Sequence, residues 1–554
     1  MTNALAFRYS TCALLAASAH VVALRAAAQE APQGRLVTPG SFADDSARLS
    51  SITSLEPRSY PLLRSASTFA PRLSGASESL RVVLVRPELY VIRNSALPYS
   101  LNDGALWAGR GFNFRVRAGF EIETGPVRFV FAPEFLGAGN SAFELLHWRV
   151  VRPMPPGRHP LSSHWHTSPE SIDLPIRFGT RTFSGWDLGQ STLDLDFGLI
   201  TAGVSTENEW WGPGVRNAIV TSTNAAGIPR FFLRTTRPMA TRAGTFDVRL
   251  FAGGLRESPY FDTTAANDLR SISAFAVTWS PRRAPNVTVG FARAVYAPTT
   301  GWGRIPTRLL DVLLRNPGRP NNHFPGDTSA VPGPDQVYSL FGRWAFPGDG
   351  LEVYAEWARN ELPTSVRDFL TAPNHTQGYT LGLQWARPVG RVGRARVQIE
   401  ATYLEKSATL RDRPVGTWYT SRAVPQGYTN RGQVIGAAIG PGADSQWLAV
   451  DYFAPRWQAG IFASRIRWDG EALYTFPAAN WAGVDSRYCS HDTSVLFGVR
   501  GALRAFFGLV ELSYSVDQRL NVFFHQVSFC GAGTDPLDVR DALNRTVEIR
   551  ITTP

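Results

Sequence analysis

The stretch "FNFRVRAGFEIE", residues 112–123, alternates apolar and polar side chains almost without a break. A β-strand directs successive side chains to opposite faces, so this alternation predicts a strand with one apolar face and one charged face. The apolar set begins with Phe112, Phe114 and Val116, and the polar set includes Arg115 and Glu121. The same pattern recurs in "LEVYAEWA" (351–358), "YTLGLQWA" (379–386) and "ARVQIEATY" (395–403). The sequence therefore predicts an all-β protein.

Two architectures use such strands. A soluble β-sandwich or propeller turns the apolar face to a core, whereas a transmembrane antiparallel outer-membrane β-barrel turns it to lipid. A tilted membrane strand needs about 9 to 11 residues, whereas soluble strands typically have about 5 to 6, and several runs here belong to the longer class. Aromatic residues also close many apolar stripes, as in the girdle of a barrel at the lipid headgroups. These residues are Trp279, Trp357, Trp385 and Tyr403.

The spacing of the connections also favours the barrel. Short segments at 124–126, 281–286, 346–350 and 387–393 alternate with long polar ones at 153–170 and 301–334. Bacterial outer-membrane barrels combine short periplasmic turns with long outer loops. We therefore expect a protein of the cell outer membrane with lipid around its wall. On this interpretation, Val116→Arg or Leu383→Arg is costly, whereas changes at Arg115 or Gln384 cost much less.

The N-terminal residues predict export and a small helical element. Arg8 precedes an apolar stretch that ends in three alanines before Gln29, the order of a signal peptide, which we assign to residues 1–28. Residues 29–80 are expected to form a partly helical periplasmic segment outside the barrel wall, with a disordered arm as the alternative. Ser41 is a candidate N-cap, and Asp44 and Asp45 suit the first turn of a helix. Residues 81–554 are assigned to the barrel and its long extracellular loops.

Charge and cysteine content narrow the function classes. The formal net charge is +11, but the arginines are dispersed along an exported chain, which argues against nucleic acid as a partner. Cys489 and Cys530 remain once the signal peptide is removed, so a disulfide between them is a candidate in an oxidising compartment. His164 and His166 in "HWH" lack a metal-binding motif around them. We expect no metal, no cofactor and a monomer.

Five segments belong together: "NDGALWAGRG" (102–111), "NEWWGPGVRNAIVTSTNAAGIPRFFLRTTRP" (208–238), "AGTFDVRLFAGGLRESPYFD" (243–262), "EVYAEWARNE" (352–361) and "WYTSRAVPQGYTNRGQVIGAAIGPGADSQ" (418–446). In this order they resemble the capsule assembly Wzi family of outer-membrane proteins. The resemblance implies a barrel of about 18 strands, a helical element that closes the periplasmic end, and a role in holding capsular or related extracellular polysaccharide at the cell surface without enzymatic chemistry. The loops and the length depart from enterobacterial members, which leaves the identity of the polymer open.

The second of these segments, together with the residue before it, also contains the candidate binding residues. Flat Trp faces pack against the C–H surfaces of pyranose rings, while Glu, Asn and Arg side chains bond to hydroxyl groups. The alternative is that the two tryptophans pack the barrel interior and the charges satisfy one another. A Gly-Pro-Gly corner after them is expected to bend the wall or to start an inward loop. The candidates for polysaccharide binding are Glu207, Asn208, Glu209, Trp210, Trp211, Arg216 and Asn217.

Two other functions remain as alternatives. A lipase or protease in a barrel needs an ordered nucleophile. The sequence has no GxSxG motif, and His525 and Ser528 are close in sequence only by coincidence, so we expect no enzyme. A passive porin for small anionic or sugar solutes has a polar, arginine-rich lumen as well. Residue patterns hardly distinguish such a channel from a plugged polysaccharide binder.

Overall fold

The computed structural model describes most of the chain. The signal peptide, both cysteines of the candidate disulfide, the "HWH" histidines, His525 and Ser528 lie outside the described residues, so these assignments stay predictions. The described residues are 36–53, 60–69, 80–144, 157–162, 171–314, 333–363, 365–411, 413, 415–471, 480–481, 484–485, 491–524 and 540–553.

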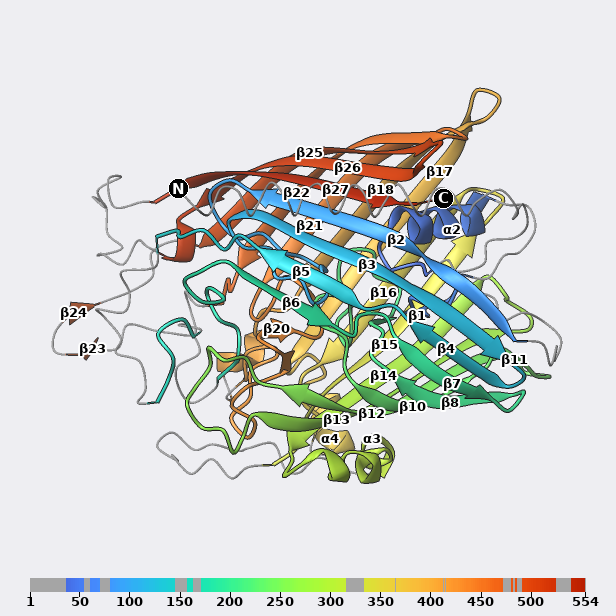
Figure 1. Cartoon of the computed structure of the whole chain (residues 1–554). Coiled ribbons are helices and arrows are strands. Elements are labelled where there is room, and N and C mark those ends of the chain that lie inside the picture. Colours follow the sequence, from blue (N-terminus) through green and yellow to red (C-terminus); the bar gives the residue numbers. More distant parts are fainter. Residues whose placement is uncertain are drawn as a thin grey trace.

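Antiparallel strands form the wall of a closed barrel (Figure 1). The wall segments are β2 (Arg81–Asn94), β3 (Gly111–Thr124), β4 (Val127–Phe131), β5 (Glu134–Ala138), β6 (Phe183–Asp187), β7 (Thr192–Asp196), β8 (Ile200–Ser205), β10 (Arg230–Thr235), β11 (Met239–Ala240), β12 (Gly244–Arg256), β13 (Leu269–Pro281), β14 (Val287–Pro298), β15 (Asp335–Phe346), β16 (Leu351–Arg359), β17 (Gln377–Val389), β18 (Gly393–Tyr403), β21 (Asp444–Phe453), β22 (Trp457–Trp468), β25 (Asp492–Ala505), β26 (Gly508–Leu520) and β27 (Ala542–Thr552).

Several shorter elements lie outside the wall sheet. The strands among them are β1 (Leu63–Ser65), β9 (Glu209–Trp211), β19 (Thr429–Asn430), β20 (Gln433–Val434), β23 (Asn480–Trp481) and β24 (Val484–Asp485). The α-helices are α2 (Phe42–Thr53), α3 (Asp311–Leu314) and α4 (Val366–Thr371), and the 3-10 turns are η3 (Trp302–Arg304), η4 (Pro306–Arg308), η5 (Ala408–Arg411) and η6 (Val522–Phe524). None of the described helices combines the length and apolar character needed to span a membrane.

The wall segments of the described residues make up 18 strands, because each of three strands is broken into two segments. β4 and β5 form one such strand, since both pair with β3. β6 and β7 form the next one, since β6 pairs with β5 and β7 pairs with β4. β10 and β11 form the third, since both pair with β12. Pro133 and Pro238 stand at two of these interruptions, where the missing N–H cannot join the ladder. The first strand β2 pairs with the last strand β27 and so closes the barrel. The predicted outer-membrane barrel fold is confirmed.

The two faces of each strand point as the alternation predicts. In β3, Phe112 is 55% exposed, whereas Asn113, Arg115 and Arg117 on the other face are at most 5% exposed. In β18, Ile399 is 46% exposed, although it lies next to buried polar residues. The apolar face is therefore outside and the charged face inside, which is the reverse of a soluble sheet and excludes a sandwich or propeller.

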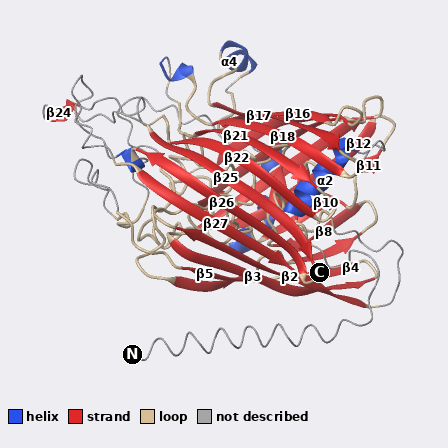
Figure 2. Cartoon of the chain, turned by 90° about the horizontal axis from the view of Figure 1, so that it is seen from above, coloured by secondary structure: helices blue, strands red, loops and turns tan. Residues whose placement is uncertain are grey.

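The connections are short at one end of the barrel and long at the other (Figure 2). The predicted turns follow β3, β13, β15 and β17, and each joins two neighbouring antiparallel strands. The two predicted long segments lie between β5 and β6 and between β14 and β15, at the opposite end. We refer to these as the short-turn end and the long-loop end. In outer-membrane barrels the short turns face the periplasm.

The predicted N-terminal helix is present as α2. The Ser41 hydroxyl accepts a hydrogen bond from the Asp44 N–H at 3.5 Å, and Asp44 and Asp45 lie in the first turn. The helix is separate from the wall, but it lies inside the barrel at the short-turn end and not outside it. Its Arg48 Nε contacts lumen-facing Glu352 at 2.6 Å. The buried ion pair explains this position, because Arg48 finds its partner only on the inner face of the wall.

Two long connections fold into the lumen beside α2. We name residues 206–229 the first inward loop and residues 415–443 the second inward loop. The Tyr419 and Tyr428 hydroxyl groups of the second loop donate to backbone carbonyls of the first, both at 2.8 Å. Facing wall strands carry small inward residues, including Ala274, Ala292 and Ala358, which leave room for these rings. The main hydrophobic core therefore lies inside the lumen, between the inward loops and β12–β16.

Leu383→Arg tests which face meets lipid. Leu383 lies midway along β17 on the same face as Leu381, which is 51% exposed. An arginine near the bilayer midplane should lower the free energy of unfolding by about 2 to 4 kcal/mol, whereas Val389→Arg at the end of the same strand should cost about 0 to 1 kcal/mol. Urea unfolding in lipid vesicles measures both. Equal costs at the two positions contradict a lipid-facing stripe.

The structure changes the expectation for the polar face. Gln384 is fully buried, donates to Glu352 Oε1 at 2.6 Å and accepts from Arg396 at 3.2 Å. Arg115 is 5% exposed and pairs with Glu88 at 3.1 Å. Removing either side chain leaves buried polar groups unpaired, which is costly. Changes on this face are therefore not cheap, because the lumen is packed and not filled with water at these positions.

Candidate binding site in the barrel lumen

The first inward loop turns sharply at the Gly-Pro-Gly corner. Gly212 has a φ of +114°, and a Cβ on Gly214 would lie 1.9 Å from the carbonyl oxygen of Asn217, so both positions need glycine. After the corner, the backbone N–H groups of Arg216 and Asn217 donate to the carboxylate of Glu400 on β18, each at 2.9 Å. The corner therefore turns the chain back within the first inward loop, which already begins after β8, so it neither bends the wall nor starts the loop.

The two adjacent tryptophans are buried inside the lumen. Trp210 is 1% and Trp211 0% exposed. The indole N–H of Trp210 donates to a backbone carbonyl of the same loop at 3.1 Å, and the Arg64 guanidinium lies 5.4 Å from its ring centroid. The indole N–H of Trp211 donates to Glu209 at 3.1 Å, and its ring packs 5.5 Å from Phe251. Protein groups therefore contact both rings.

The two glutamates that flank Asn208 also have protein partners, although the Oε1 atom of Glu207 is buried without a hydrogen bond to a described residue. Glu209 lies between Arg230 at 2.8 Å and Arg249 at 2.5 Å. Burial by itself opposes the charge of Glu209, but the two guanidinium groups outweigh it and lower the pKa of the carboxyl. Glu207 is 2% exposed and accepts a hydrogen bond from the Ser67 hydroxyl at 3.0 Å. These charges fix the loop to the N-terminal segment and to β10 and β12.

The two candidate asparagines hold the loop in the same way. Asn208 accepts from Gln190 Nε2 at 2.9 Å and donates to a backbone carbonyl of the loop at 2.8 Å. The amide of Asn217 donates to the hydroxyls of Thr402 and Ser445, both at 3.3 Å. Both asparagines are buried, at 6% and 3% exposure. Their amide groups are therefore engaged with the barrel.

Arg216 differs from the other six candidates. It is half-buried, and its guanidinium stacks 4.3 Å from the ring centroid of Trp447 on β21. Within the described part of the chain, its side chain makes no hydrogen bond or ion pair. The structure thus brings all seven predicted residues into the lumen, but it packs six of them against protein groups. Their contact with a polysaccharide stays a prediction.

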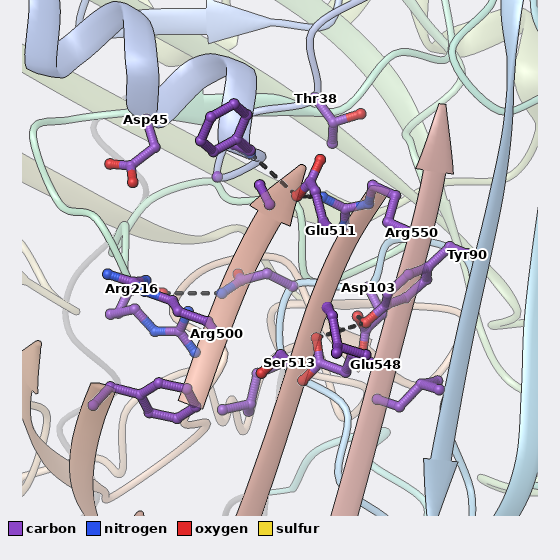
Figure 3. Close-up of a pocket in the computed structure, with 18 of the residues that line it drawn as sticks. Thr38, Asp45, Tyr90, Asp103, Arg216, Arg500, Glu511, Ser513, Glu548 and Arg550 are labelled. Atoms are coloured by element: carbon purple, nitrogen blue, oxygen red, sulfur yellow. Dashed lines mark hydrogen bonds and ion pairs between the residues drawn. The ribbon is translucent and has the colours of Figure 1, made fainter. Parts of the chain in front are cut away.

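A cavity of about 200 Å³ lies between the first inward loop, the start of α2 and one side of the wall (Figure 3). Trp210 and Arg216 line it, together with residues that the sequence analysis did not single out. Figure 3 has Arg216 and Arg500 on one side and Tyr90, Asp103 and Glu548 on the other. The charged lining residues are Arg115, Arg216, Arg500, Arg550, Asp45, Asp103, Glu511 and Glu548.

Three of the four arginines that line this cavity are paired with carboxylates. Each therefore has its charge balanced before a ligand arrives, and Arg216 alone among the four has no carboxylate partner in the described residues. The pairs are Arg500 with Asp451 (2.7 Å), Arg550 with Glu511 (3.4 Å) and Arg115 with Glu88 (3.1 Å).

Sequence reasoning missed most of the lining because alternating strands carry inward polar residues everywhere. Nothing in the alternation distinguishes Arg500 or Arg550 from other lumen-facing arginines. Two lining residues could have been found from the family resemblance, because Asn102 begins the segment at 102–111 and Trp447 directly follows the segment at 418–446. Both segments meet the first inward loop at the cavity.

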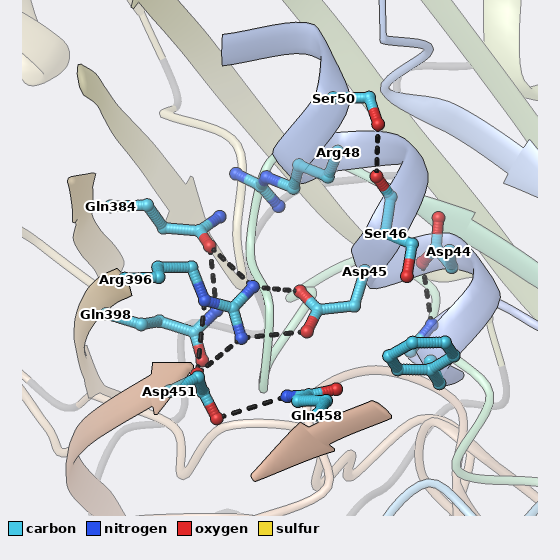
Figure 4. Close-up of polar contacts among 12 residues, drawn as sticks. Asp44, Asp45, Ser46, Arg48, Ser50, Gln384, Arg396, Gln398, Asp451 and Gln458 are labelled. Atoms are coloured by element: carbon cyan, nitrogen blue, oxygen red, sulfur yellow. Dashed lines mark hydrogen bonds and ion pairs between the residues drawn. The ribbon is translucent and has the colours of Figure 1, made fainter. Parts of the chain in front are cut away.

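A buried ion cluster fixes α2 at the edge of this cavity (Figure 4). Arg396 on β18 is fully buried between two carboxylates. Its Nη2 lies 2.8 Å from Asp45 of the helix and 2.6 Å from Asp451 of β21. The amide of Gln458 also donates to Asp451 at 3.2 Å. The cluster ties the helix to the wall and closes part of the short-turn end.

Metal chemistry has no support in the described part of the barrel. No group of three or more His, Cys, Asp or Glu residues there could hold a metal ion. The site is built from guanidinium, carboxyl, hydroxyl and aromatic groups, which suits recognition of a polar ligand by hydrogen bonds and stacking.

The comparisons with known proteins concern the fold. No family model and no curated protein matches the chain. Among solved structures, the chain is similar to Wzi of Escherichia coli, described as an outer membrane protein involved in group 1 capsule assembly and a carbohydrate-binding β-barrel, with a TM-score of 0.51, 11% identity and 84% of each chain covered.

Two weaker similarities are to porin-type barrels. One is to OccK2 (OpdF) of Pseudomonas aeruginosa, with a TM-score of 0.36, 11% identity, and 84% of this chain and 97% of that chain covered. The other is to a BenF-like porin of Pseudomonas fluorescens, with a TM-score of 0.39, 10% identity, and 86% and 99% covered. The expected resemblance is confirmed at the level of the fold: the described residues form an 18-stranded outer-membrane β-barrel with the architecture of Wzi.

Proposed function

We propose that this chain is a non-enzymatic outer-membrane protein that binds or anchors capsular or other extracellular polysaccharide at the cell surface. The observation that carries the proposal is the packed lumen. Residues of α2 and of both inward loops fill the barrel with a hydrophobic core and buried ion pairs. A binding protein tolerates such a filled barrel, whereas a channel needs a continuous water path. The description of Wzi as a carbohydrate-binding barrel supports the same choice.

The ligand class is supported by the chemistry of the remaining free space. Sugars offer hydroxyl groups to planar polar side chains and C–H faces to aromatic rings. The lumenal cavity combines Tyr90, Tyr99 and Trp210 with Arg216 and several carboxyl groups. We found no motif of an ordered nucleophile in the sequence, so binding without turnover is the simpler assignment.

Deletion of the gene tests the proposal directly. Cells without the protein should keep less polysaccharide on their surface and shed more into the medium, with the total amount unchanged, because retention is lost and synthesis is not. The measurement is uronic-acid and total-sugar content in the cell pellet and in the supernatant. A deletion strain with the same cell-bound fraction as the parent contradicts the proposal.

A passive porin is the alternative function. The purified barrel in a planar lipid bilayer should give no stable ion conductance, because the inward loops occupy the lumen. As a control, a variant without residues 206–229 should conduct if its barrel still forms. Steady open channels in the unmodified protein favour the porin.

A further inference from the structure

The cavity beside the first inward loop contains an arginine prepared for an anion. Trp447 is held by its indole N–H, which donates to Gln398 at 3.0 Å, and by Phe462, which stacks on it at 4.8 Å. Arg216 lies over this fixed ring, 4.3 Å from its centroid. A guanidinium placed over an aromatic ring keeps N–H groups available, and its fork matches a carboxylate in two parallel hydrogen bonds.

Neighbouring polar groups in the cavity also lack protein partners. The Asn102 amide donates to the backbone carbonyl of Arg216 at 3.0 Å, but its Oδ1 is buried without a hydrogen-bond partner in the described residues. The Tyr99 hydroxyl makes no hydrogen bond to a described residue, and burial raises the pKa of Tyr99, so it stays a neutral donor. One cation, one donor and one acceptor therefore line the same cavity as Trp210.

We propose that this cavity binds one carboxylate-bearing sugar unit of an acidic polysaccharide, with Arg216 pairing with the carboxylate and with Tyr99 and Asn102 bonding to hydroxyl groups. The glycan class rests on the proposed function, while the location and the charge preference are new. The cavity of about 200 Å³ lies below the range of about 300 to 1,000 Å³ that holds drug-sized ligands, which suits a single sugar unit.

The carboxyl groups of the cavity do not oppose this ligand strongly. Glu511 is paired with Arg550 at 3.4 Å. Asp103 accepts hydrogen bonds from the hydroxyls of Tyr90 at 2.9 Å and Ser100 at 2.7 Å. Burial raises the pKa of Asp103, while these two hydrogen bonds act in the opposite direction. Asp45 is paired with Arg396, and Glu548 accepts a hydrogen bond from the Tyr90 hydroxyl at 3.2 Å. Arg216 is the lining arginine that has no carboxylate partner among the described residues.

The cavity extends to the short-turn end of the barrel. Its lining includes the exposed Gly40 before α2, Glu511 near the start of β26 and Arg550 near the end of β27. Since short turns face the periplasm in outer-membrane barrels, a sugar unit reaches this site from the periplasmic side.

Binding of D-glucuronate and D-glucose to the purified full-length barrel in detergent micelles tests the site. The two sugars differ only at C6, where glucuronate carries the carboxylate. Titration followed by saturation-transfer NMR should give a Kd for glucuronate roughly tenfold or more below that for glucose, because a bidentate charge-assisted contact is added. The preference should weaken as salt rises, because screening reduces exposed charge contacts.

Variants of Arg216 identify the group that reads the carboxylate. Arg216→Gln should abolish the preference, and Arg216→Lys should keep a part of it, because the charge remains without the fork. Both variants keep the backbone hydrogen bond from residue 216 to Glu400. Arg387→Gln is the control, since Arg387 is a 49% exposed arginine at the same end of the barrel, and it should bind as the unmodified protein does.

The outcomes separate this site from the proposed function. Equal affinity for the two sugars, or an Arg216→Gln variant that keeps the preference, overturns the site. The proposed function is then tested independently by surface retention in the deletion strain. A glucuronate preference that depends on Arg216 supports the site even if deletion leaves retention unchanged. Heat-resistant gel mobility verifies that each variant is folded before its binding is compared.

Discussion

Arg396→Ala should lower the free energy of unfolding by about 3 to 5 kcal/mol, because it removes one partner from a buried ion cluster. Arg396 is fully buried, and its guanidinium joins Asp45 of α2 to Asp451 of β21. Without it, the Asp45 carboxylate loses its partner, whereas Asp451 keeps a second one in Arg500 at 2.7 Å. Chemical unfolding in detergent micelles, followed by tryptophan fluorescence, measures the loss.

The same change should release α2 from the wall. Limited proteolysis of the folded variant should cut within the N-terminal segment before the barrel unfolds, because the helix loses a contact to β18. Arg387→Ala is the control, since that exposed side chain lies 3.9 Å from Asp349 and should cost at most about 0.5 kcal/mol. If both variants unfold alike, the cluster does not hold the helix.

Trp211→Ala should also cost about 3 to 5 kcal/mol, the usual effect of truncating a packed tryptophan. The ring is completely buried against Phe251, and its N–H donates to Glu209, which itself bridges Arg230 and Arg249. The variant should be less abundant in the outer membrane and lose heat-resistant gel mobility. Trp211→Phe keeps part of the ring volume and should lose much less.

This variant also distinguishes packing from sugar contact. Polysaccharide retention, divided by the amount of folded barrel, should stay unchanged in Trp211→Ala if the ring only packs the lumen. A folded, normally abundant variant that releases polymer contradicts the packing role and supports direct contact.

Acidification tests the ion pairs of Glu209. Burial opposes its charge, but Arg249 and Arg230 outweigh burial and lower the pKa of the carboxyl. The stability that these ion pairs contribute is therefore present above the usual carboxyl pKa and is lost as the pH falls through the lowered pKa.

Local patterns determined the barrel. Side chains alternate with a period of two along a strand, so the stripe in residues 112–123 specifies which side meets lipid whatever its neighbours are. The Ser41 cap of α2 and the turn after Thr124 are equally local, since each depends on residues a few positions apart. These features of the fold could therefore be read from the chain alone.

Only the tertiary structure decided what fills the lumen and where the site lies. Arg396 meets Asp45 across 351 positions, and Tyr419 meets Ile219 across 200, so no local pattern encodes either contact. Inward polar residues look the same in sequence whether water, a ligand or another segment of the chain satisfies them. The chemistry of the segment at 207–217 grouped Arg216 with six residues that are packed, and the fold separated it from them by leaving its guanidinium unpaired over Trp447. The sequence decides the faces of each strand because that choice is local, whereas partners inside the barrel depend on which distant segments the closed wall brings together.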